Sequence, residues 1–76
     1  MQKNCWRIKC NHTPESLDRI IMPFRKRGMT VEAVSYKNEG GEKATCVVEF
    51  MEDPIKAELI YKNLMRTVDV VGIEKI

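Results

Sequence analysis

Cysteine and histidine are the residues of this chain that could bind a metal or act as nucleophiles. The sequence holds three cysteines and one histidine, and Cys10, His12 and Cys46 could meet in the fold. A structural zinc site needs four ligands, so these three side chains do not complete one, and their spacing matches no zinc motif. The chain also lacks a Cys-x-x-Cys pair, which disfavours a redox motif. We therefore interpret Cys10 and Cys46 as small buried hydrophobic residues and predict no metal site.

Catalysis would need an acid, a base or a nucleophile that a second polar group holds in place. The single histidine, His12, stands in a turn beside Thr13, Glu15 and Ser16. Because helix capping accounts for Thr13 and Ser16, no catalytic constellation remains. We predict that the chain has no catalytic residues and is not an enzyme by itself.

Length and composition indicate one small globular domain over residues 1–76. Of the 76 residues, 43% are hydrophobic and 32% are charged, and the net charge is +2. The one basic cluster, residues 25–27, falls at an expected helix end, where cations offset the helix dipole, so nucleic-acid binding is disfavoured. No apolar run approaches the roughly 18 residues of a membrane span, and the start lacks an apolar signal core. We expect no membrane partner and a cytoplasmic location.

The turn that carries His12 leads from a strand into a helix. Alternation predicts the strand over residues 5–10. Thr13 should cap the helix and Pro14 should be its first residue. Pro23 should kink the last turn without ending the helix, and Gly28 should then end it in a left-handed conformation. The side chains expected to be buried are Trp6, Ile8 and Cys10 on the strand and Leu17, Ile20, Ile21 and Phe24 on the helix.

The second half of the chain repeats this order after a hairpin. Strands are expected at residues 29–37 and 44–50, joined by a glycine-containing loop at residues 38–42. Asp53 should cap a second helix that begins at Pro54. The expected buried stripe of that helix is Ile55, Leu59, Ile60, Leu64 and Val68. The remaining expected faces are Cys46, Val48 and Phe50 on one strand, and Val71 and Ile73 on a last strand at residues 70–76.

The order strand, helix, strand, strand, helix, strand is that of a ferredoxin-like α+β fold, βαββαβ. Right-handed crossovers leave a gap of one strand between the first two strands, and the hairpin lets the third strand fill it. We therefore predict a four-stranded antiparallel sheet in the order 4-1-3-2 with both helices on one face. RNA binding is disfavoured because the open face offers no aromatic residue for base stacking, only Arg7, Lys9, Thr45, Val47 and Glu49.

Three stretches carry a resemblance to a known family: residues 13–20 (TPESLDRI), 25–31 (RKRGMTV) and 64–73 (LMRTVDVVGI). They resemble an ACT domain, in particular the short, single-domain small regulatory subunit of acetolactate synthase (acetohydroxyacid synthase). The resemblance implies a noncatalytic, activating subunit in branched-chain amino-acid biosynthesis that binds a large catalytic subunit. That large subunit would hold thiamine diphosphate, a flavin and magnesium, whereas this chain would hold no cofactor.

The turn before the first helix departs from the pattern of amino-acid-sensing ACT domains. In those relatives a proline–glycine pair lets the effector approach free backbone N–H groups. Here Glu15 follows Pro14, and its carboxylate would crowd the site and repel the carboxylate of an amino acid. His12 stands where sensing relatives have an asparagine. We therefore predict weak or no valine sensing at a degenerate ligand loop made of Asn11, His12, Thr13, Pro14, Glu15 and Ser16.

The resemblance also implies that two ACT domains pair side by side. The second strand is an edge strand in the predicted order, so its backbone could pair with another chain. We expect a homodimer through the first helix and the second strand, with a partner surface made of Thr30, Glu32, Val34 and Tyr36. Alternatively, Val34 and Tyr36 only cover the open face. Two other functions stay open: a free-standing ACT-like domain that senses a different amino acid or small metabolite, and an unrelated ferredoxin-like interaction domain.

Overall fold

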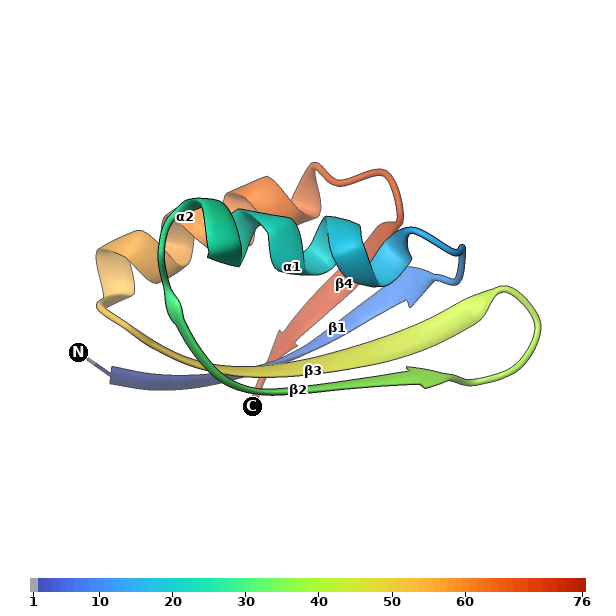
Figure 1. The fold of residues 1–76 in the computed structure, drawn as a ribbon, viewed down its shortest axis with the longest axis horizontal. Coiled ribbons are helices and arrows are strands. Elements are labelled where there is room, and N and C mark those ends of the chain that lie inside the picture. The colour runs from blue at the N-terminus through green and yellow to red at the C-terminus, as the bar shows by residue number, and fades with distance from the viewer. Residues whose placement is uncertain (1) are drawn as a thin grey trace.

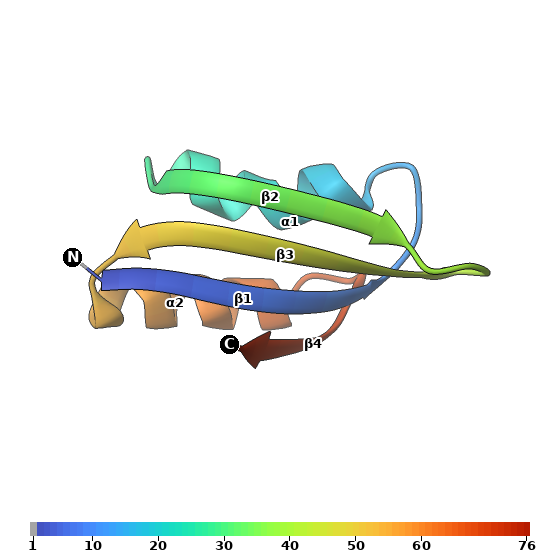
Figure 2. The same ribbon diagram turned by 90° about the horizontal axis from the view of Figure 1, so that it is seen from below.

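The computed structural model describes residues 2–76, which form a sheet covered by helices (Figure 1). In chain order the elements are β1 (Gln2–Asn11), α1 (Ser16–Lys26), β2 (Thr30–Asn38), β3 (Lys43–Glu52), α2 (Pro54–Met65) and β4 (Val70–Lys75). The strands lie in the order β2-β3-β1-β4, and each neighbouring pair is antiparallel. Both helices cover one face, and Figure 2 shows the other face open. The ferredoxin-like α+β fold with the order 4-1-3-2 is therefore confirmed.

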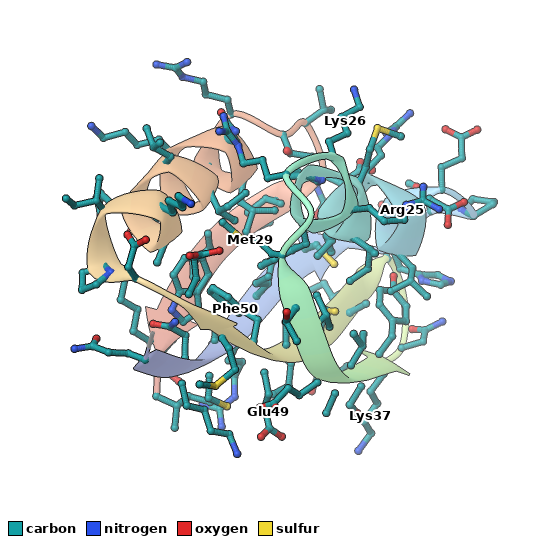
Figure 3. The ribbon with its side chains drawn as sticks, turned by 60° about the vertical axis from the view of Figure 1, so that its left-hand side comes forward. Arg25, Lys26, Met29, Lys37, Glu49 and Phe50 are labelled. Carbon is teal, nitrogen blue, oxygen red and sulfur yellow. The ribbon has the colours of Figure 1, made fainter. Side chains whose placement is uncertain are left out.

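The core lies between the sheet and the helices. The predicted inward-facing rows of the central strands are confirmed, since every member is buried: Trp6, Ile8 and Cys10 on β1, and Cys46, Val48 and Phe50 on β3. The Phe50 ring contacts Trp6 edge-on, with 4.9 Å between ring centroids, and Phe24 of α1 with 5.0 Å. Figure 3 shows Phe50 inside this layer and its neighbour Glu49 on the open side of the sheet. Aromatic contacts therefore hold α1 onto β3.

The start of α1 differs from the prediction. The helix begins at Ser16 and its N-cap residue is Glu15, whose side chain makes no capping hydrogen bond. The Thr13 hydroxyl lies 2.9 Å from Ser16 Oγ, and the Ser16 N–H donates to the Thr13 carbonyl at 3.1 Å. Residues 13–16 thus form a turn of their own, so the prediction that Thr13 caps the helix and Pro14 begins it is wrong.

The buried face of α1 is also rotated from the predicted one. Ser16, Ile20 and Phe24 are buried one turn apart, and Ile21 packs partly against the core. Leu17 is 38% exposed, so its place in the buried stripe is wrong. The reason is that a fully buried serine occupies the first position of the row, which turns Leu17 to the flank of the helix.

The helix α1 ends where it was predicted to end, at a left-handed Gly28. The helix continues past Pro23 to Lys26, and Gly28 adopts a φ of +64°. The Gly28 N–H donates to the Arg25 carbonyl at 3.1 Å, and the Met29 N–H donates to the Phe24 carbonyl at 3.0 Å. These two bonds define a Schellman motif, which pairs the last carbonyls of the helix and lets the chain turn into β2.

The second helix begins as predicted but buries other residues. Asp53 accepts a hydrogen bond from the Lys56 N–H at 2.9 Å, and Pro54 occupies the first turn. The predicted stripe is wrong in three places, because Ile55 is 78% exposed, Val68 is 85% exposed, and Leu59 is also exposed. The buried row consists of Ala57, Ile60 and Leu64. The small Ala57 side chain lets this face lie close to the sheet.

A bulge in β2 overturns the predicted facing of this edge strand. Its pairing with β3 shifts register at Glu32, and beyond it Val34 and Tyr36 pair with residues of the buried row of β3. One extra residue turns all the following side chains to the opposite face. Val34 and Tyr36 therefore lie on the helix-covered side, and the prediction that they share the open side with Thr30 and Glu32 is wrong.

A second bulge lies where β4 pairs with β1, next to Cys10. It separates Val71 from Ile73, which were predicted to share a face. Val70 and Ile73 pack against the core, whereas Val71 is exposed. The predicted facing of β4 is therefore wrong for the same physical reason as that of β2.

Replacing Gly28 with alanine should lower the free energy of unfolding by about 1 kcal/mol, because a left-handed backbone disfavours a side chain. The Schellman bonds require that conformation at the observed φ of +64°. The midpoint of urea denaturation measures the change. Gly72→Ala is the matched control, since an added Cβ at Gly72 meets nothing within 4 Å and the φ of Gly72 lies outside the positive range that disfavours a side chain. Equal midpoints for the two variants would contradict the role of Gly28.

Candidate functional site

Three distant parts of the chain meet at the β1–α1 turn. The His12 N–H donates to the Glu42 carbonyl of the β2–β3 hairpin at 2.6 Å, and its Nδ1 lies 2.8 Å from the Tyr36 hydroxyl. The Asn11 N–H donates to the Asp69 carbonyl, in the α2–β4 loop, at 2.8 Å. The turn is therefore anchored on both sides, to the end of the hairpin and to the start of β4.

A buried carboxylate lies beneath this turn. Asp69 is 5% exposed, and its Oδ2 accepts a hydrogen bond from Arg19 at 2.8 Å. The same guanidinium donates to Glu15 Oε2 at 2.7 Å, so it joins a buried carboxylate to an exposed one. The hydroxyls of Thr13 and Ser16 lie 3.5 and 3.4 Å from Asp69 Oδ2. A buried carboxylate needs such a charged partner, because desolvation of an unpaired charge is costly.

The polar groups of the turn bond mainly to one another. Ser16 Oγ accepts from the Thr13 N–H at 2.8 Å and donates to the Asn11 carbonyl at 2.7 Å. The His12 ring is bonded to Tyr36, and Glu15 is bonded to Arg19. An incoming amino acid would have to displace these contacts and face the Glu15 carboxylate. These contacts fix the shape of the turn. Because the polar groups bond to one another, they are not arranged as an acid–base pair for catalysis.

The buried thiols are unsuited to nucleophilic chemistry. Burial raises the pKa of Cys10, although a hydrogen bond with Tyr36 lowers it in part. Burial, and then the nearby Cys10, raise the pKa of Cys46 to about 11. Both thiols are therefore protonated at neutral pH. The prediction that Cys10 and Cys46 are buried small residues is confirmed. Among residues 2–76, no three His, Cys, Asp or Glu side chains are grouped so that they could hold a metal ion.

The sequence predicts part of this cluster, namely the turn residues Asn11, His12, Thr13, Pro14, Glu15 and Ser16. It does not predict Asp69 and Arg19, which hold the turn. Tyr36 was predicted on a partner surface, but its hydroxyl contacts His12. A signal was present, since Asp69 is an acidic residue between valines at the start of a strand.

The predicted partner surface lies on the edge strand, as Figure 2 shows for β2. Thr30 and Glu32 belong to this strand, with Thr30 exposed and Glu32 at the bulge. Val34 is 43% exposed even though it is on the helix side of the sheet. Its exposure follows from its place on the edge strand of the sheet. In the described part of the chain, no helix is long and apolar enough to cross a membrane.

Solved structures share this fold over nearly the whole chain. The acetolactate synthase small subunit from Thermotoga maritima matches with a TM-score of 0.85 and 17% identity, over 99% of this chain and 47% of that chain. The chain thus spans about half the length of that subunit. The ACT domain from GTP pyrophosphokinase of Chlorobium tepidum matches with a TM-score of 0.79 and 14% identity, over 97% of this chain and 96% of that chain.

The regulatory subunit of aspartate kinase from Thermus thermophilus also matches, with a TM-score of 0.70 and 15% identity, over 97% of this chain and 48% of that chain. No family model matches the sequence, and no curated protein matches it significantly. At these identities the likeness shows the fold alone, which is that of ACT domains.

Thiol accessibility should separate the cysteines of the native protein. We expect Ellman's reagent to modify Cys5 rapidly, because it is partly exposed, and to leave Cys10 and Cys46 unmodified. All three should react after unfolding in denaturant. Absorbance of the released thiolate at neutral pH measures both phases. Cys5→Ser should remove the rapid phase, and rapid reaction of the native Cys5→Ser variant would contradict the burial of the other thiols.

Proposed function

We propose that this ACT-type domain is a noncatalytic, activating small subunit of acetolactate synthase, with weak or no valine sensing. The observation that carries the proposal is the match to the Thermotoga maritima small subunit, with a TM-score of 0.85 over 99% of this chain. The resemblance of residues 13–20, 25–31 and 64–73 supports the same assignment. The partner would be the large catalytic subunit, which would hold thiamine diphosphate, a flavin and magnesium. A cytoplasmic location stays a prediction from the sequence.

The β1–α1 turn supports regulation by protein contact more than by an amino acid. Backbone N–H groups or a cation could hold the carboxylate of a bound amino acid, and Arg19 is the cation bonded to residues of the turn. Arg19 already pairs with Glu15 at 2.7 Å and with Asp69 at 2.8 Å. The ligand carboxylate would compete with both and would be repelled by their charge. The geometry therefore favours a turn that keeps its shape without an effector.

A homodimer is part of the proposal, and α1 and β2 support it together. Leu17 and Ile21 lie one turn apart on α1, and Leu17 is exposed. Arg19 and Met22 line a groove toward α2, so Leu17 and Ile21 face the other way, toward the β2 edge. The bulge puts Val34 on the helix side of that edge. An apolar strip thus runs along the edge strand β2, and a domain of this size gains from covering it.

A free-standing ACT-like domain that senses another amino acid or small metabolite is the second candidate. It is favoured by the match to the ACT domain from GTP pyrophosphokinase, since that match links the same fold to a protein other than an acetolactate synthase subunit. An affinity screen of amino acids against the isolated chain separates the two candidates.

Reconstitution tests the leading candidate. We expect the chain to co-purify with the acetolactate synthase large subunit from the same source and to raise its activity severalfold. Added valine should leave the activity of the complex unchanged, and calorimetry should detect no micromolar binding of valine, leucine or isoleucine. Absence of both binding and activation would refute the assignment, and micromolar valine binding would refute the degenerate ligand loop.

The dimer predicts a concentration-dependent mass. Analytical ultracentrifugation should show twice the monomer mass of 8.8 kDa at high concentration. Val34→Glu should shift the equilibrium to monomer, because it places a charge in the apolar strip, with at least a tenfold weaker dimer. Val71→Glu is the matched control, since Val71 is exposed on β4, at the opposite edge of the sheet. A monomer mass for the unmodified chain, or equal effects of the two substitutions, would contradict this interface.

A further inference from the structure

A groove lies between the two helices, away from the β1–α1 turn and the β2 edge. Its volume is about 590 Å³. One wall is α1 with its C-cap residue and the other is the end of α2 with the loop after it. Its lining residues are Arg19, Met22, Pro23, Lys26, Arg27, Asn63 and Thr67. The groove lies on the outer, helical side of the molecule, where Figure 3 shows Lys26 far from the open face of the sheet.

The groove is basic. Within the described part of the chain, its lining contains three basic side chains, Arg19, Lys26 and Arg27, and no acidic side chain, although the whole chain has a net charge of only +2. Among residues 2–76, neither Lys26 nor Arg27 lies within 4.0 Å of a carboxylate in an ion pair. Their position at a helix end accounts for some stabilisation. The helix dipole does not explain why Met22, an apolar side chain in the same groove, is 38% exposed.

Pro23 gives this wall a second property. A proline has no N–H, so the helix leaves the carbonyl of Arg19 without its usual partner four residues on. Arg19 and Pro23 both line the groove. The wall therefore combines cations, an apolar surface and a backbone acceptor. An extended peptide offers the matching groups, since it has carboxylates, apolar side chains and backbone N–H donors.

We propose that this groove binds an acidic segment of a partner protein that also carries an apolar side chain. Carboxylates of the segment pair with Lys26 and Arg27, and its apolar side chain packs on Met22 and Pro23. A second copy of this chain is a poorer occupant, because a symmetric contact would bring two basic walls together. A single phosphate would leave most of the 590 Å³ and the apolar wall unused. The inference rests on the proposed function, since it names the surface that would meet the large subunit.

The first experiment tests the chemistry of the groove without the large subunit. The probe is a fluorescein-labelled peptide of glutamate and leucine, and the control peptide has lysine for glutamate. Fluorescence anisotropy with the full chain should show binding of the acidic peptide alone. Binding should weaken at least tenfold in the variant with Lys26→Glu and Arg27→Glu, and severalfold in Pro23→Ala, which restores the missing N–H. Raising the salt from 0.1 M to 1 M should also weaken it, since the Debye length falls from about 10 Å to about 3 Å.

Arg25→Glu is the matched control, because Arg25 is exposed in the same helical turn but does not line the groove. It reverses a charge at the same helix end and should leave binding unchanged. Circular dichroism checks that each variant is folded. Equal peptide affinity of the unmodified chain and the groove variants would overturn the inference, and so would an equal loss in Arg25→Glu.

The second experiment separates this inference from the proposed function. The acetolactate synthase large subunit is titrated with the same variants. If the unmodified chain activates it and the Lys26→Glu, Arg27→Glu variant does not, both proposals are supported. If the two activate it equally, the function stands and the groove is not its contact surface. If the acidic peptide binds in the groove but the large subunit is neither bound nor activated, the groove stands and the assigned partner is wrong.

Discussion

The contact between Arg19 and Asp69 is the interaction on which the rest of this small domain depends. Asp69 is almost completely buried, and its carboxylate would be strongly unfavourable without a charged partner. Arg19 supplies that partner from α1 at 2.8 Å. The pair joins residues that are 50 positions apart and links the first crossover of the fold to the start of its last strand. It therefore fixes the end of the molecule at which the β1–α1 turn lies.

The form of that turn follows from the same carboxylate. Ser16 is buried, and its hydroxyl donates to the Asn11 carbonyl and lies 3.4 Å from Asp69 Oδ2. With Ser16 inside, the helix starts there and Thr13 has no helical N–H to cap. Glu15 is then placed where its carboxylate reaches the outer side of Arg19. A turn built around internal bonds is already ordered, so a ligand would gain little by ordering it and would lose the bonds it displaced.

The sequence predicted the local structure correctly in two situations. One is a residue type that favours a particular backbone conformation, and the other is a strand with one face buried along its whole length. Gly28 predicted the left-handed end of α1, and the alternation around Ile8 and Val48 predicted two complete inward rows. The prediction of which side chains face the core failed at Glu32 and beside Val71. A bulge depends on how a strand pairs with its partner, so the alternation of residues within one strand does not reveal it. The site was predicted only locally, since no periodicity connects Arg19 to Asp69.

The helix α1 has three faces, which point in different directions. One row, led by Ser16, is buried on the sheet. A second flank, with Leu17, faces the edge strand β2 and is apolar, whereas a third, with Lys26, faces α2 and is basic. These flanks differ in chemistry, so two contacts on them need not compete. Because Arg19 stands between the turn and the basic flank, a carboxylate placed in the groove would act on the same guanidinium that holds Asp69. Contact with a partner would thereby reach the turn directly, through charge.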